Sequence, residues 1–220
     1  VASTDDAVAV EETVTAETRP AGLPAEEITP QSIITLLRRV DALIARQDYD
    51  EAKKILIRIL SWKDDHLEAG VHLAYVYLQS GEYRKAENLY RKALEARPRD
   101  ASLLTNFALA VLEQKDPTRI GDAVEAFTLA AEIDPKNAER HANHGQALFF
   151  SGDIPKAIAA FERAIRLQPR NVEYHFFMAD SYLAVRNFAG AKSAFEKILG
   201  IQPNNADASN EKMELERMGY

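Results

Sequence analysis

The chain has 220 residues, of which 46% are hydrophobic and 28% are charged, a balance typical of globular proteins with one or two domains. It contains no cysteine, which excludes disulfides and Cys-based metal sites, and no run of about 18 apolar residues that would span a bilayer. Most of the net charge of −7 belongs to residues 1–30, which hold seven acids and one arginine. The sequence shows no clustered basic face, which argues against nucleic-acid binding.

Residues 1–30 lack a helical period, are rich in Thr, Ala, Glu and Val, and end at Pro30. We interpret them as an acidic flexible tail. The alternation around Val8–Val14 leaves an alternative, in which an extended segment docks on a binding groove of this or a neighbouring molecule. The start at Val1 instead of Met is consistent with removal of an upstream signal or anchor, so cytoplasm and periplasm both stay open.

Prolines mark a repeating period along the rest of the chain. Pro98, Pro135, Pro169 and Pro203 each follow a segment of helical pattern, and the successive gaps are 37, 34 and 34 residues. Because a fixed period of about 34 residues is typical of arrays of helix pairs, we expect tandem repeats.

Each repeat contains the pattern of two helices. In the second helix, Ala86, Ala157 and Ala191 stand among large apolar residues at spacings of three and four, which lie on one helical face. The first helix carries a small residue beside a large one, as in Leu73-Ala74. A small side chain beside a large one allows the paired helices to pack closely.

A turn separates the two helices of a pair. Gly81 and Gly152 stand where the first helix should end, since glycine adopts the left-handed conformation of a helix C-terminus. The acidic residue that follows each glycine suits the start of the next helix.

These columns place five repeats at 33–66, 67–100, 101–137, 138–171 and 172–205. The first is the most diverged, with Asp64 in place of proline. The third is three residues longer at Lys115–Thr118, which we interpret as a neutral loop, with a partner-contacting bump as the alternative. Residues 206–218 predict one more helix, a polar cap that closes at Gly219.

The recurring columns resemble the tetratricopeptide-repeat (TPR) family over most of the chain. The resemblance implies an all-α fold, a right-handed superhelix (α-solenoid) of five helix-turn-helix repeats and a C-terminal capping helix. In such an array the first helix of every pair lines a concave surface. The domain plan is therefore an acidic tail at 1–30 and a TPR domain at 31–218.

The residues offer no recognisable catalytic or cofactor chemistry. His141 and His144 lie one helical turn apart, but no third ligand stands at a fixed spacing, so we expect packed histidines and no metal site. Glycines occur singly at turns, which argues against a phosphate loop, and no nucleophile motif is present. We therefore expect neither a cofactor nor an enzyme.

The expected concave face carries one polar column, formed by Arg38, His72, Asn106, Asn143 and Phe177. Asparagine both donates and accepts hydrogen bonds, so a row of them can hold the backbone of an extended peptide. Apolar neighbours complete the candidate partner-binding set: Tyr75, Leu109, Phe149 and Phe176. A solvated helix face without a fixed ligand is the alternative.

The chain does not resemble the TPR proteins that clamp a C-terminal carboxylate. The Lys and Arg residues of that clamp are absent from the corresponding positions, whichever repeat the alignment starts from. The sequence thus favours a non-catalytic scaffold or adaptor of bacterial type, which binds a peptide or protein segment in the groove and assists complex assembly or localisation. The alternative is a structural protein that self-assembles through its tail or convex face, with homo-oligomers as the product.

Overall fold

The described part of the chain comprises residues 29–220 of a computed structural model, where it forms eleven α-helices and no strand. Apart from Thr29 and Pro30, the predicted tail lies outside the described residues. The helices fall into two units, residues 29–76 and residues 77–220, and each is described by itself. None of the helices within residues 29–220 combines the length and apolar composition that a bilayer span requires.

Unit 1 contains α1 (Pro30–Ala45), α2 (Tyr49–Trp62) and most of α3 (Leu67–Gln79). Helix α1 begins three residues before the predicted repeat because Thr29 and Ser32 form a capping box. Thr29 Oγ1 accepts from the Ser32 amide at 3.1 Å, and Ser32 Oγ accepts from the Thr29 amide at 2.8 Å. Pro30 occupies the first helical position, where the absence of an N–H costs nothing.

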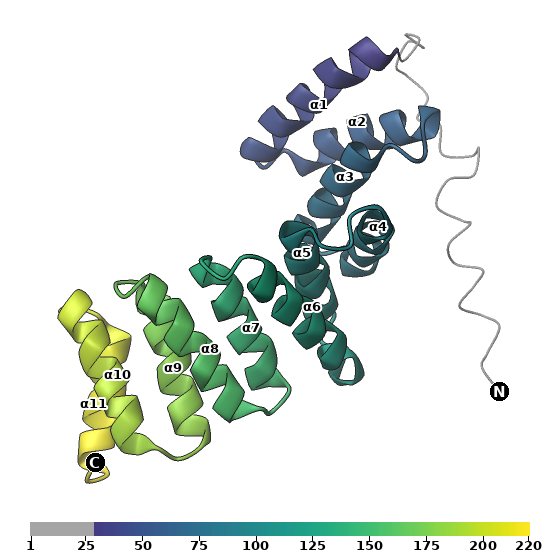
Figure 1. Ribbon diagram of the computed structural model, residues 1–220. Helices are drawn as coiled ribbons and strands as arrows, with labels where there is room; N and C mark the ends of the chain where they lie inside the picture. Colours follow the sequence, from purple (N-terminus) through teal and green to yellow (C-terminus); the bar gives the residue numbers. More distant parts are fainter. Residues whose placement is uncertain (1–28) are drawn as a thin grey trace, which may run out of the picture. The chain divides into compact units, whose positions relative to one another are not determined.

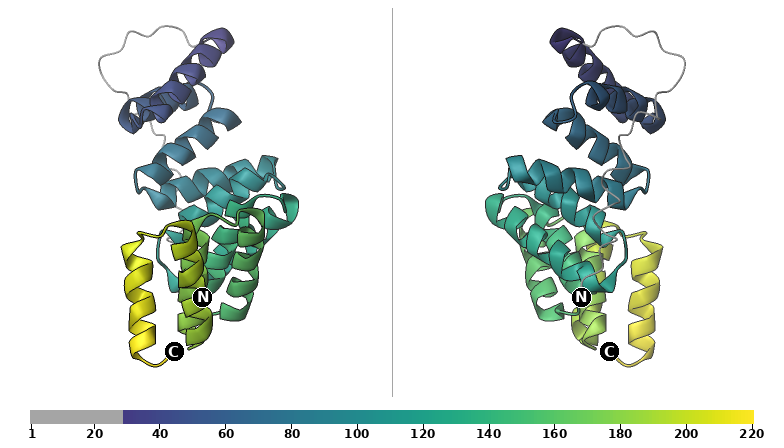
Figure 2. Two further views of the ribbon diagram at one scale, coloured as in Figure 1. Left: turned by 90° about the vertical axis from the view of Figure 1, so that its left-hand side faces the viewer. Right: turned by 90° about the vertical axis from the view of Figure 1, so that its right-hand side faces the viewer.

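Unit 2 holds the other helices, which Figure 1 shows as consecutive pairs from α5 to α10. Figure 2 shows α11 beside α10 at the end of this row. Each predicted repeat contains two helices and residues 206–218 contain α11, so the all-α fold of five helix pairs and a capping helix is confirmed. The bounds are α4 (Tyr83–Ala96), α5 (Ala101–Leu112), α6 (Ile120–Ile133), α7 (Ala138–Phe150), α8 (Ile154–Leu167), α9 (Val172–Ala184), α10 (Phe188–Ile201) and α11 (Ala206–Arg217).

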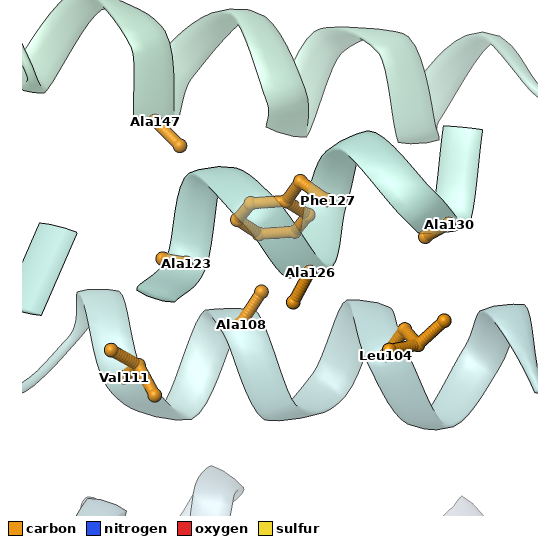
Figure 3. Close-up of a cluster of buried hydrophobic side chains, with 8 residues drawn as sticks. All are labelled: Leu104, Ala108, Val111, Ala123, Ala126, Phe127, Ala130 and Ala147. Atoms are coloured by element: carbon orange, nitrogen blue, oxygen red, sulfur yellow. The ribbon is translucent and has the colours of Figure 1, made fainter. Parts of the chain in front are cut away.

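The core of unit 2 follows the predicted small-and-large columns. Figure 3 shows Phe127 of α6 among alanines of its own and neighbouring helices, and its ring is fully buried. Tyr90, Phe161 and Phe195 are the equivalent rings of the other pairs, and each is at most 1% exposed. Burying a large apolar side chain contributes about 1.5–3 kcal/mol, so each ring of this column stabilises the packing between helices.

Turns within the pairs use the left-handed conformation that the sequence predicted. Gly81 and Gly152 have φ of 76° and 84°. Gln47, Lys115 and Arg186 adopt φ of 61°, 55° and 58° at the same place in the other repeats, although they carry a Cβ. A left-handed residue other than glycine costs roughly 1–2 kcal/mol, so these three turns are held by the packing of the flanking helices.

The longer connection of the third repeat is anchored to the preceding helix. It forms a 3₁₀ turn, η2 (Pro117–Arg119), and Arg119 reaches back to Glu87 of α4 with two hydrogen bonds of 2.8 and 2.9 Å. Gln114 donates to the same carboxylate at 2.7 Å, and Arg91 pairs with it from one turn away. We call Glu87, Arg91, Gln114 and Arg119 the clasp, which gives this insertion a structural role.

Candidate functional site

The first helices of consecutive pairs lie next to one another in unit 2. Helix α5 contacts α7, and α7 contacts α9, in addition to the second helices that each of them packs against. Predicted binding residues on these three helices can therefore share one surface. We call this set the first-helix face: Asn106, Leu109, Asn143, Phe149, Phe176 and Phe177.

Two amide side chains stand on adjacent helices of the first-helix face. Asn106 on α5 and Asn143 on α7 are both half-buried. Within residues 29–220 neither side chain has a hydrogen-bond partner, so both amides retain their donors and acceptors. Two unused amides on neighbouring helices are suited to pair with the backbone of an added strand or peptide.

Arg140 fixes the spacing between α5 and α7. Its guanidinium donates to the Ala101 carbonyl and to Thr105 Oγ1, both at 2.6 Å, and to Ser102 Oγ at 3.2 Å. Its Nε also donates to Asp134 at 3.3 Å. This side chain ties the start of α7 to the first turn of α5 and so positions Asn143 relative to Asn106.

The aromatic residues of the first-helix face are shared between surface and core. Phe177 stacks on Phe161 with ring centroids 5.4 Å apart, and Phe176 meets Phe195 edge-on at 6.2 Å. Phe149 is also half-buried, packed beside the buried Leu148 cluster. Only part of each ring is open to a ligand, so the face offers apolar strips instead of deep pockets.

Three predicted binding residues belong to unit 1. Arg38 is exposed on α1, and Tyr75 is half-buried on α3. His72 Nε2 lies 3.4 Å from an Asp41 carboxylate oxygen, while the buried Nδ1 atom has no partner within the described residues. The predicted polar column is thus divided, with Arg38 and His72 in unit 1 and Asn106, Asn143 and Phe177 in unit 2.

The histidines of unit 2 have structural partners. His141 and His175 are both buried, and each Nε2 lies 2.9 Å from the carbonyl of the proline six residues earlier. His144 Nε2 is 3.0 Å from Thr128 Oγ1, and burial lowers the pKa of His144. Residues 29–220 contain no group of three or more side chains arranged to hold a metal ion.

Two surface depressions of unit 2 lie away from the first-helix face. One of about 230 Å³ is formed between α9 and α10, where His175, Tyr182 and Lys197 contribute to its wall. The other, of about 520 Å³, surrounds the turn 202–207 before α11. Neither of these two depressions includes a predicted binding residue.

Two family models match the sequence, and both describe the tetratricopeptide repeat. One covers residues 43–106 and the other residues 143–206, together more than half of the chain. The chain belongs to the TPR family. TPR proteins are in general non-catalytic scaffolds for protein–protein interaction, and the fold supports that general role here. No curated protein matches the sequence closely enough to count as a relative.

Solved TPR structures share the fold at low sequence identity. YrrB, described as a TPR protein with an unusual peptide-binding site, has a TM-score of 0.70 and 18% identity, covering 81% of this chain and 90% of its own. MamA gives 0.68 and 20%, covering 76% and 96%. PilF of Pseudomonas aeruginosa gives 0.70 and 22%, covering 86% and 84%. At these identities the likeness establishes the TPR fold alone.

Sequence reasoning missed the residue that organises this part of the TPR face. Arg140 does not belong to the predicted set. It donates to Ser102 and Thr105 of the preceding repeat, 38 and 35 positions earlier in the chain. The only signal in the sequence is an isolated basic residue in the first turn of a first helix.

Proposed function

We propose that the protein is a non-catalytic scaffold whose first-helix face binds an extended segment of a partner protein, and that it thereby helps to assemble or localise a larger complex. The observation that carries this proposal is the pair of unused amides, Asn106 and Asn143, on adjacent helices. In TPR arrays the first helices line the concave side, where an extended peptide can lie across them.

The chemistry of the two amides favours a backbone ligand. Each can donate to a peptide carbonyl and accept from a peptide N–H, whatever side chains the peptide carries. A hydrogen bond of this kind contributes about 0.5–1.5 kcal/mol net. Because Arg140 already fixes the two helices, little further ordering of the protein is needed on binding.

The exposed parts of the neighbouring rings would supply apolar contact. Phe176 and Phe177 are consecutive on α9, and both keep a fraction of their surface open. Such strips suit alternate side chains of an extended peptide, which point to one side of its backbone. The amides would give affinity for the backbone and the rings some choice of side chain.

A display selection tests this proposal. Phage-displayed random dodecapeptides are selected on the wild-type chain, and the enriched peptides are synthesised and measured by fluorescence anisotropy. Asn106→Ala/Asn143→Ala should weaken binding by about 10- to 30-fold, the equivalent of roughly 2 kcal/mol. Asn88→Ala on α4 is the matched control, since that asparagine is exposed on a second helix.

The proposal fails if the double variant keeps its helical circular-dichroism spectrum and binds the selected peptides as tightly as the wild type. Self-assembly through residues 1–30 or the convex face stays a prediction, since almost all of that tail lies outside the described residues.

A further inference from the structure

Two carboxylates, one on α9 and one on the capping helix α11, lack a neutralising partner. Asp180 stands in the middle of α9 and Glu211 in the middle of α11, and both are exposed. Helices α9 and α11 pack into one core cluster through Ala179 and Ala208, so Asp180, the next residue along, lies at this junction. Within residues 29–220 neither carboxylate forms an ion pair or a hydrogen bond.

Several cations of the neighbouring helices are engaged with other acids. Helix α9 contains no lysine or arginine. Lys192 and Lys212 both pair with Glu216, at 3.3 and 3.4 Å, and Arg217 pairs with Glu214. None of these three cations pairs with Asp180 or Glu211.

Helix geometry explains other acids of this region but not these two. Glu139, Glu173 and Asp207 lie in the first turns of α7, α9 and α11, where a negative charge favours the helix dipole. Asp180 and Glu211 lie beyond the first turn and gain nothing from it. Partial burial, and then the like charge of Glu211, raise the pKa of Asp180.

Apolar surface stands directly beside the two carboxylates. Phe176 and Phe177 precede Asp180 by four and three positions on α9, and these spacings place all three on one side of the helix. Both rings are partly buried and keep some exposed surface. A lysine or arginine side chain suits such a place, because its stem packs on an aromatic surface while its charged end meets the carboxylates.

We propose that Asp180 and Glu211, beside Phe176 and Phe177, receive a lysine or arginine side chain of the bound segment, so that the partner of this scaffold is a basic peptide. This inference rests on the proposed function and specifies the chemistry of its ligand. The acid-rich residues 1–30, with seven acids against one arginine, carry the wrong charge to be that segment. A bare metal ion is also disfavoured, since no group of three ligands exists in residues 29–220.

The experiment selects random dodecapeptides in parallel on the wild-type chain and on Asp180→Asn/Glu211→Gln. Peptides from the wild type should be enriched in lysine and arginine over the starting library, and those from the variant should not. The most frequent wild-type peptide should bind the variant about 10-fold more weakly, and replacing its basic residue with glutamine should cause a similar loss.

A matched variant separates local recognition from general attraction between charges. Glu125→Gln/Glu132→Gln removes two exposed carboxylates from α6 and changes the net charge by the same amount. It should leave the affinity for the basic peptide within about 2-fold of wild type. An equal loss in both double variants overturns the proposal. Circular dichroism confirms folding, and the single variant Glu211→Gln on the capping helix serves if the double variant unfolds.

The outcomes distinguish this inference from the proposed function. Selected peptides that are neutral or acidic, and that depend on Asn106 and Asn143, would overturn the basic-ligand inference and leave the scaffold function standing. If no peptide is selected at all, both proposals fail. A peptide from the acid-rich residues 1–30 that competes with the selected peptides for the first-helix face would likewise overturn the inference.

Discussion

Replacing Arg119 with methionine should destabilise unit 2 by removing the main partner of a buried carboxylate. Glu87 is only 4% exposed, and Arg119 gives it two charge-assisted hydrogen bonds of 2.8 and 2.9 Å. Burial alone would raise the pKa of Glu87, but hydrogen bonds from Arg119 and Gln114 lower it below its ordinary value. The buried group is therefore held as a carboxylate by the clasp.

The size of the effect follows from these contacts. Each hydrogen bond to a charged group contributes about 1.5–3 kcal/mol, and Arg119 is itself partly solvated, which weakens the pair. Glu87 also keeps Gln114 and Arg91 in the variant. We expect a loss of about 2–3 kcal/mol, which corresponds to a fall in Tm of roughly 5–10 °C for a chain of this size.

Urea titration and calorimetry at pH 7 measure this loss, and Asp122→Asn is the control. Asp122 pairs with the other side of Arg119 at 2.9 Å but is exposed, so its removal should cost less than about 0.5 kcal/mol. The pKa of Glu87 is lowered in the folded state, so the stability that the charged group contributes is lost as the pH falls through its folded-state pKa. The free energies of unfolding of the wild type and of Arg119→Met should therefore converge in acid. If Arg119→Met is no less stable than Asp122→Asn at pH 7, the clasp does not stabilise the array.

Four further substitutions have defined outcomes. Gly145→Ala should cost about 1–3 kcal/mol in urea titrations, because the new methyl group would lie 2.6 Å from the Phe161 ring, and an unchanged midpoint would contradict this close packing. Arg186→Gly should raise the free energy of unfolding by about 1 kcal/mol, since φ is 58° there and glycine adopts this conformation without strain. Gly152→Ala, at φ of 84°, should lower it by a similar amount. Melting temperatures that shift in the same direction in both variants would refute the argument. Asp180→Asn should stabilise the free protein by less than about 1 kcal/mol at pH 7. The gain should vanish in acid, because a carboxyl group whose folded pKa is raised destabilises the fold only when it is charged. A difference in stability between wild type and variant that is equal at pH 7 and in acid would contradict this argument.

The helix pairs were predictable because their determinants are local and periodic. Pro98, Pro135, Pro169 and Pro203 set the register, and the alanine columns then identified which faces are buried. The left-handed turns at Gly81 and Gly152 were also confirmed. The start of α1 was missed, because a capping box of Thr29 and Ser32 differs from the usual pattern that ends in Glu or Gln.

Contacts between repeats were not predictable, because no local pattern records them. Arg119 and Glu87 are separated by 32 positions, and Arg140 and Thr105 by 35. The binding residues stay a prediction, but the structure shows that Phe176 and Phe177 are partly committed to core stacking. Nor does the sequence reveal that Asp180 is unpaired, since the ion pairs of Lys192 and Lys212 appear only in the fold.

The clasp has a consequence for the chain under tension. In a linear array each repeat is held by its neighbours alone, so a pulling force can peel helices from one end in steps. Glu87 of α4 is bonded to the connection between α5 and α6, so the peeling of α5 and α6 must break a buried charge pair as well as apolar contacts. We therefore expect extension by optical tweezers to pause before α5 and α6 separate from α4.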